Sequence, residues 1–157
     1  EKTKMSMYKI KKIIIFTFIS FHFLSIEVLA IENFFSLKYS KVNVRYGPGK
    51  DYPIKFIYKK KNLPIKIIDK KENYRRIIDL KKNSGWIHWT QLKKANSFII
   101  LENKILFKKP TNFSKPIANL EKGRLLIVKK CQNNWCNIKT GKYSGWVKTD
   151  NTWGSIR

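Results

Sequence analysis

The chain has 157 residues, a formal net charge of +24 and only two cysteines. This length allows one or two small domains, and the charge predicts general attraction to anionic surfaces. Only five of the basic residues are arginines. Proteins that recognise nucleic-acid phosphates and base edges rely on the bidentate hydrogen bonding of arginine. The scarcity of arginine therefore argues against a specific nucleic-acid partner.

The first 30 residues have the order of a secretory signal. Lysines precede an apolar run at residues 13–26, and Val28-Leu29-Ala30 precedes a cleavage point. A membrane anchor is the alternative, but this run is shorter than the roughly 20 apolar residues of a transmembrane helix. We therefore expect residues 1–30 to be a signal peptide, leaving an exported, periplasmic or envelope-associated protein with no stable transmembrane segment after cleavage. Cleavage would remove five lysines and two glutamates, which lowers the net charge from +24 to +21.

The remaining residues predict short β-strands separated by turns. Residues 42–44 alternate and lead into Gly47-Pro48-Gly49, where Pro48 and Gly49 suit the central positions of a type II turn. Further β-branched and aromatic runs predict strands at residues 54–58, 65–68, 74–78 and 86–89.

The same order then recurs about sixty positions later. Gly85-Trp86-Ile87 corresponds to Gly145-Trp146-Val147, and Asn73-Tyr74 corresponds to Asn134-Trp135. An internal period of this length indicates a duplication, and each unit has the short strands of a small barrel or sandwich. Two units of about 60 residues are marginal alone. We expect them to pack together, with Trp86 and Trp146 in their cores.

Cys131 and Cys136 flank a plausible hairpin turn in the second unit. An oxidising compartment favours a disulfide between them, and free thiols are the alternative. A zinc site would need two further ligands, and His88 is the only histidine after the signal. A Cys–His hydrolase would require Cys136 and His88 to meet across the two units. The sequence therefore predicts no enzyme, no catalytic residue, no metal and no cofactor.

The order Asn43-Val44-Arg45, Gly47-Pro48 and Gly85-Trp86-Ile87 resembles the bacterial SH3-like (SH3b) domain. The resemblance covers about residues 36–157, with one domain at 36–94 and a second at 97–157. It implies an all-β protein: two tandem small SH3-like barrels after the signal peptide, which bind peptides or cell-wall components without catalysis. In the second unit, Leu106-Phe107-Lys108-Lys109-Pro110 replaces the signature, which predicts a mainly structural role there.

An aromatic-lined loop groove in the first unit is the predicted ligand site, because such grooves hold extended peptides. Its residues are Arg45, Tyr46, Gly47, Pro48, Tyr52 and Trp89. Arg45 would either pair with a carboxylate of a wall peptide or anchor its own loop. The leading hypothesis is an envelope binding module for peptidoglycan peptide or another anionic envelope ligand. The alternative is a periplasmic protein–protein interaction scaffold.

Overall fold

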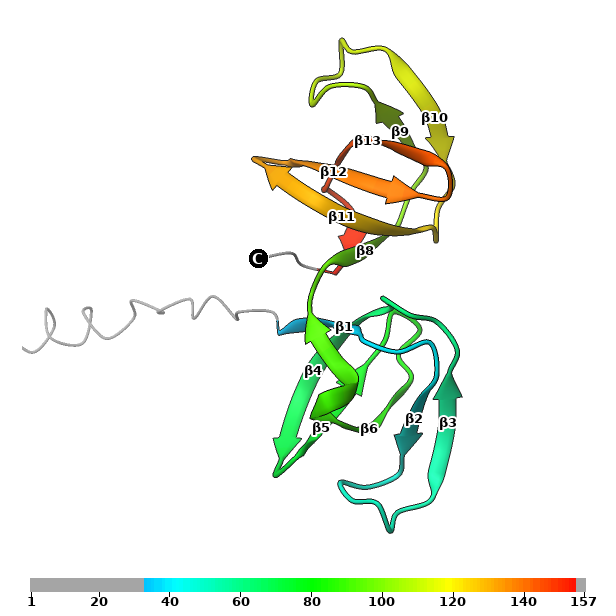
Figure 1. Ribbon diagram of the computed structural model, residues 1–157, viewed down its shortest axis with the longest axis vertical. Helices are drawn as coiled ribbons and strands as arrows, with labels where there is room; N and C mark the ends of the chain where they lie inside the picture. The colour runs from blue at the N-terminus through cyan, green and yellow to red at the C-terminus, as the bar shows by residue number, and fades with distance from the viewer. Residues whose placement is uncertain (1–32, 155–157) are drawn as a thin grey trace, which may run out of the picture. The chain divides into compact units, whose positions relative to one another are not determined.

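The computed structural model describes residues 33–154, which form β-strands joined by turns, irregular loops and one short 3-10 helix. The predicted signal peptide lies outside these residues. Glu32–Arg157 forms one compact unit. Within residues 33–154, no helix is long and apolar enough to cross a membrane. The all-β class predicted from the sequence is confirmed (Figure 1).

Residues 34–94 form the first seven-stranded antiparallel sheet, which we call repeat 1. Its order is β3-β2-β6-β5-β4-β1-β7. The strands are β1 (Phe34–Leu37), β2 (Val42–Arg45), β3 (Ile54–Tyr58), β4 (Pro64–Lys71), β5 (Tyr74–Ile78), β6 (Ser84–His88) and β7 (Leu92–Lys94). A 3-10 turn, Trp89–Gln91, connects β6 to β7.

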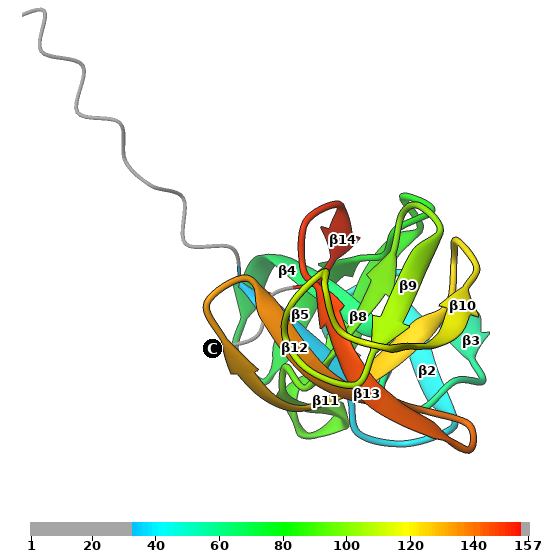
Figure 2. The same cartoon turned by 90° about the horizontal axis from the view of Figure 1, so that it is seen from above.

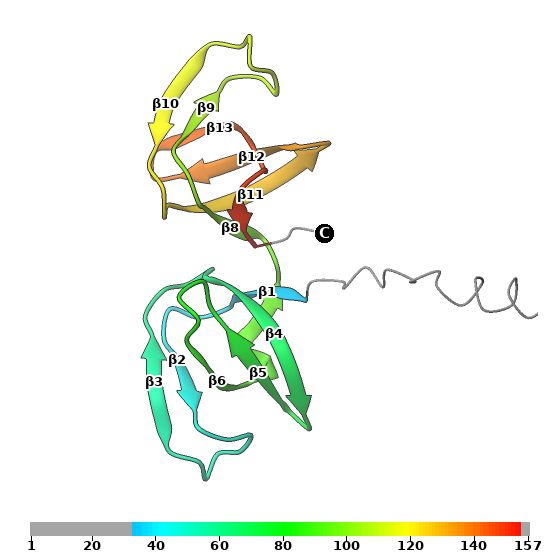
Figure 3. The ribbon, with the colours of Figure 1, turned by 180° about the vertical axis from the view of Figure 1, so that it is seen from behind.

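Residues 97–153 form the second sheet, repeat 2, in the order β10-β9-β13-β12-β11-β8-β14. Its strands are β8 (Ser97–Ile100), β9 (Lys104–Phe107), β10 (Pro116–Leu120), β11 (Leu125–Gln132), β12 (Trp135–Thr140), β13 (Tyr143–Lys148) and β14 (Thr152–Trp153). The two strand orders correspond one to one, which confirms the duplication. Figure 2 and Figure 3 show the hairpins of each repeat from two further sides.

Each repeat has its own apolar core. The first contains Leu37, Val42, Val44, Ile65, Ile77 and Ile87. The second contains Phe98, Ile100, Leu106, Leu120, Leu126, Cys136, Ile138 and Val147. The core prediction is wrong for Trp86, which is only half-buried, whereas Trp146 is buried, with 8% of its surface exposed. Successive strand residues face opposite sides, so Ile87 and Val147 enter the apolar clusters and the preceding tryptophans pack on the other side of their strands.

The Gly47-Pro48-Gly49 turn also differs from the prediction. A type II turn would need a positive φ at Gly49, and Gly49 does not have one. Instead, the Gly49 N–H donates to the Gly47 carbonyl at 3.0 Å, which closes a three-residue turn around Pro48. The glycines provide space, because a Cβ on Gly47 would overlap the ring of Tyr52.

Hydrogen bonds and an aromatic contact join the two repeats across the short 95–96 connection. The hydroxyl oxygens of Ser36 and Ser97 lie 2.9 Å apart, and both side chains are fully buried. The Trp153 indole N–H donates to the Pro64 carbonyl at 3.2 Å. The same indole meets the Phe34 ring edge to face at 5.1 Å. These contacts agree with the expectation that the two units pack together.

The disulfide between Cys131 and Cys136 is present. The two residues are direct partners in the β11–β12 hairpin, and their Cα atoms lie 4.1 Å apart. Asn133 turns this hairpin with a φ of +49°, a conformation that asparagine tolerates better than most residues.

Candidate ligand-binding face of repeat 1

The outer face of β2, β6 and β5 gathers polar and aromatic side chains that are distant in the sequence. Trp86 on β6 lies directly opposite Arg45 on β2 and Arg76 on β5. Tyr74 lies directly opposite His88 in the next row. Directly paired residues project from the same side of a sheet. The three strands therefore present these five side chains on one surface.

A hollow of about 370 Å³ lies at one side of this surface. Its lining residues are Asn43, Arg45, Lys50, Tyr74, His88, Thr90 and Gln91. Two of them are permanent cations, four offer amide or hydroxyl groups, and none carries a carboxylate. Such a lining suits a negatively charged ligand that also has hydrogen-bonding groups.

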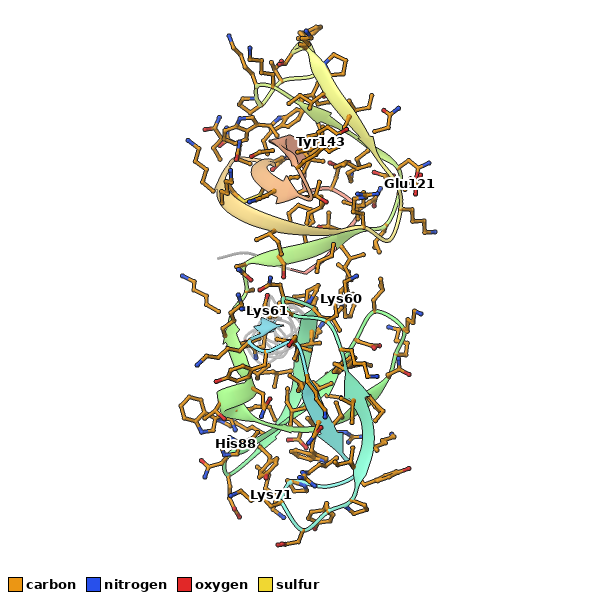
Figure 4. All side chains as sticks on the ribbon, turned by 45° about the vertical axis from the view of Figure 1, so that its right-hand side comes forward. Lys60, Lys61, Lys71, His88, Glu121 and Tyr143 are labelled. Atoms are coloured by element: carbon orange, nitrogen blue, oxygen red, sulfur yellow. A yellow bond between two sulfur atoms is a disulfide. The ribbon has the colours of Figure 1, made fainter. Side chains whose placement is uncertain are left out.

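Contacts within the hollow fix its side chains. The Nδ1 atom of His88 lies 2.7 Å from the Thr90 hydroxyl, and its ring meets Tyr74 edge to face at 5.3 Å. Figure 4 labels His88 among the side chains on the outside of repeat 1. An Nη1–H of Arg45 donates to the Tyr52 carbonyl at 2.7 Å. This hydrogen bond uses one of the five N–H donors of the guanidinium group. Arg45 therefore anchors its own loop and also lines the hollow.

A second hollow, of about 290 Å³, lies beside Trp86. Tyr46, Lys55, Arg76, Ser84, Gly85 and Trp86 line it. The Lys55 ammonium lies 5.6 Å from the centre of the Tyr46 ring and donates to the Ser84 carbonyl at 3.0 Å. Arg45 and Tyr46 are adjacent in the sequence but line different hollows.

The structure does not bring the six predicted site residues into one groove. Arg45 lines the first hollow and Tyr46 the second. Gly47, Pro48 and Tyr52 form the connecting loop, in which the Tyr52 ring packs over Gly47 and Gly49. Trp89 is 52% exposed beside His88, with 6.3 Å between the ring centres, and lines neither hollow.

The six predicted site residues leave out Lys50, Tyr74, Arg76 and His88. The signal that could have added the last three is cross-strand pairing. Once Trp86 is placed on the outer face, Arg45, Arg76 and the alternate residue His88 must share it.

Aromatic rings occupy three of the five corresponding positions of repeat 2. Phe107 lies opposite Trp146, as Arg45 lies opposite Trp86. Trp135 lies opposite Lys148, as Tyr74 lies opposite His88. The Phe107 and Trp135 rings meet edge to face at 5.8 Å. The two repeats therefore present different chemistry on equivalent faces.

Within residues 33–154, no group of three or more histidine, cysteine, aspartate and glutamate residues is placed to hold a metal ion. Both cysteines are in the disulfide.

No curated protein matches the chain. Among solved structures, the chain is similar to one titled "Structure of NlpC2 from Trichomonas vaginalis", with 9% identity and a TM-score of 0.37. The match covers 79% of this chain and 48% of the other, so this chain spans about half the length of that protein. A likeness at this level indicates neither an activity nor a ligand for this chain.

A family model of the bacterial SH3 domain matches two regions in tandem, residues 38–94 and 102–154. Bacterial SH3 domains are commonly cell-wall binding modules and are typically non-catalytic. This family and a disulfide together suggest an extracellular or envelope protein. The strand order, the paired cores and these two matches identify the chain as a member of the bacterial SH3 domain family, with the domain present twice.

Proposed function

We propose that this protein is a non-catalytic, exported envelope module whose repeat 1 binds a carboxylate-bearing ligand, with the peptide of peptidoglycan as the leading candidate. The observation that carries this proposal is the first hollow, where Arg45, Lys50 and His88 meet without a carboxylate in the lining. The predicted signal at residues 1–30 would deliver the module to the envelope.

The hollow supplies the groups that a short anionic peptide needs. The Arg45 fork matches a carboxylate in two parallel hydrogen bonds, and the exposed Lys50 adds charge at the rim. The amides of Asn43 and Gln91 suit the peptide groups of the ligand. Repeat 1 thus provides recognition, while the lysine-rich surface provides general attraction.

Co-sedimentation of residues 31–157 with purified sacculi, at low and high salt, tests this proposal. We expect Arg45→Ala to weaken binding about tenfold, because a charge-assisted bidentate contact is lost. Arg124→Ala is the matched control, since it removes the same charge from an exposed site in repeat 2. We expect it to change binding less than twofold at high salt, where general attraction is screened.

Arg45→Lys separates the charge of Arg45 from its hydrogen-bonding geometry. The lysine keeps the charge but lacks the planar fork. We expect it to bind almost as weakly as Arg45→Ala. Equal binding by the Arg45→Ala and Arg124→Ala proteins would refute the hollow as the binding site. Wild-type binding that disappears at high salt would show that net charge was the only attraction.

Exposed aromatic side chains on repeat 1 favour a second candidate, a protein–protein scaffold in the envelope. Tyr46 is 62% exposed and Trp89 is 52% exposed, and aromatic residues are enriched at protein interfaces. This scaffold function predicts capture of a specific envelope protein that is lost in a Tyr46→Ala/Trp89→Ala variant. It also predicts no affinity for sacculi.

A further inference from the structure

Phe113 is the most exposed large apolar side chain described in the molecule. It is 99% exposed and lies in the loop between β9 and β10, residues 108–115, which we call the Phe113 loop. Figure 1 shows this loop extending beyond the ends of both strands. Burying a phenylalanine side chain is strongly favourable, and repeat 2 leaves this contribution unused.

Hydrogen bonds hold the Phe113 loop in one shape. The Lys108 N–H donates to the Lys115 carbonyl at 3.0 Å, and the Lys109 N–H donates to the Ser114 hydroxyl at 2.8 Å. The Ser114 N–H donates to the Thr111 carbonyl at 3.2 Å. Phe113 is therefore displayed on an internally bonded loop.

The charges around Phe113 are all positive. Lys108, Lys109 and Lys115 are exposed, and residues 104–120 contain no aspartate or glutamate. Ile105 and Ile117, on the two strands of the same hairpin, are 45% and 38% exposed and add apolar surface. An apolar tip within a ring of lysines is complementary to an anionic surface with an apolar interior.

The equivalent loop of repeat 1 lacks the ring of lysines. Residues 46–53 contain one lysine and one aspartate, Lys50 and Asp51. Of its two tyrosines, Tyr52 packs back over Gly47 and Gly49, and Tyr46 lies beside the Lys55 ammonium at the second hollow. These tyrosines are 47% and 62% exposed, whereas Phe113 is 99% exposed and purely apolar. A fully exposed apolar tip among lysines is therefore a specific feature of repeat 2 and does not follow from the fold.

We propose that the Phe113 loop docks repeat 2 onto an anionic phospholipid bilayer. Phe113 enters the interfacial region, and the three lysines contact headgroup phosphates while their alkyl stems lie along the apolar boundary. The Phe113 loop is convex, and a convex loop fits into a deformable lipid surface better than into the preformed pocket of another molecule. This inference goes beyond the proposed function, because it concerns a different repeat and a different ligand.

Vesicle flotation with Glu32–Arg157 tests the docking. This compact unit contains every described strand, both cores and the disulfide, and it omits the apolar run at 13–26, which would itself bind lipid. We expect binding to phosphatidylcholine vesicles that contain about one third phosphatidylglycerol, and little binding to pure phosphatidylcholine.

Phe113→Ala should lower the partition coefficient about tenfold, because the inserted apolar surface is lost. Phe113→Trp should retain binding, since tryptophan favours the interface. Tyr39→Ala is the matched aromatic control at an exposed position of repeat 1 and should leave the partition coefficient unchanged. Equal binding by wild type and Phe113→Ala would overturn the proposal.

A pair of charge variants separates local docking from general attraction. The Lys108→Gln/Lys109→Gln/Lys115→Gln protein should lose about fivefold per lysine in affinity for anionic vesicles. The Lys59→Gln/Lys60→Gln/Lys61→Gln protein removes the same charge from exposed positions of repeat 1 and should lose only a few fold. Equal losses in the two proteins would overturn the proposal.

A sacculus assay identifies the source of the anionic ligand. Phe113→Ala should bind sacculi as the wild type does, so this result is independent of the Arg45 experiment. Weakened binding to sacculi with unchanged binding to vesicles would assign the loop to the cell wall and refute the membrane. Phe113 is fully exposed, so the melting temperature of Phe113→Ala should equal that of the wild type.

Discussion

Repeat 1 and repeat 2 place different chemistry at the same cross-strand positions. Lys70 and Arg75 are direct partners in the β4–β5 hairpin, at the place where Cys131 and Cys136 are bonded in the β11–β12 hairpin. The inward-facing residues of both repeats are mostly aliphatic, with Phe98 and Cys136 as the exceptions in repeat 2. The comparison teaches that the core residues determine this fold, while the remaining pairs are free to carry stability or function.

The turns that follow β5 and β12 differ in the same way. Asp79, two residues after Ile77, accepts hydrogen bonds from the Tyr58 hydroxyl at 3.0 Å and from the Asn83 backbone and side chain, each at 2.9 Å. Burial, together with the Asp79 carboxylate, raises the pKa of Tyr58. Thr140, two residues after Ile138, holds the matching place in repeat 2. Repeat 1 thus relies on a buried polar network, and repeat 2 on a disulfide.

The largest effect on stability is expected from Asp79→Ala. It removes the acceptor of three hydrogen bonds in a largely buried site and should lower the free energy of unfolding by about 3 kcal/mol. Urea denaturation measures the total loss. Hydrogen exchange should show faster opening at Ile77 and Ile87 than at Ile138 and Val147. Thr140→Ala is the matched control and should cost about 1 kcal/mol or less. A uniform loss of hydrogen-exchange protection across both repeats would contradict the inference that each repeat is stabilised by its own interactions.

The next largest effect is expected from reduction of the Cys131–Cys136 disulfide. Removing the constraint on this short loop should lower the free energy of unfolding by about 2 kcal/mol. Hydrogen exchange with and without a reductant should show the loss at the amides of β11 and β12 and little change in β4 and β5. If reduction leaves β11 and β12 equally protected, the hairpin is held by its pairing and core contacts alone.

The smallest effect is expected from a surface ion cluster in repeat 2. The Lys104 ammonium donates to Glu102 at 2.8 Å, and the Asn151 amide donates to the same carboxylate at 3.0 Å. These two hydrogen bonds lower the pKa of Glu102 below its usual value of 4.5. Its contribution to stability is therefore complete above pH 4.5 and is lost as the pH falls through the lower folded value.

Glu102→Gln should accordingly make the stability of the protein less dependent on pH below 4.5. Thermal melts of the wild type and the variant between pH 3 and pH 6, roughly, measure the difference. The Glu102 side chain is about half exposed to solvent, and screening by water keeps this effect small. Identical pH dependence in the two proteins would show that the cluster does not contribute.

Most of the architecture could be predicted because it rests on local pattern. Gly85-Trp86-Ile87 and Gly145-Trp146-Val147 mark the same strand in both repeats, and their spacing reveals the duplication. The hairpin disulfide follows from two cysteines around an asparagine turn. The orientation of Trp86 could not be predicted, because a strand with Trp next to Ile offers two apolar residues and only one can face inward.

The candidate site was harder to predict because it depends on pairing between distant strands. Arg45 and Trp86 become neighbours only when β2 pairs with β6, and Tyr74 joins them only through β5. The loop aromatics looked like one cluster in the sequence. In the structure, the ring of Tyr52 fills the space over Gly47, and Tyr46 lines the second hollow, which lies beside Trp86.

The position of the disulfide also simplifies oxidation of the chain. The sequence contains only two cysteines, so a single intramolecular pairing exists and no monomer can be mispaired. Both lie in one hairpin, five positions apart, and meet as soon as β11 and β12 pair. Maturation therefore needs an electron acceptor but no isomerase to reshuffle bonds.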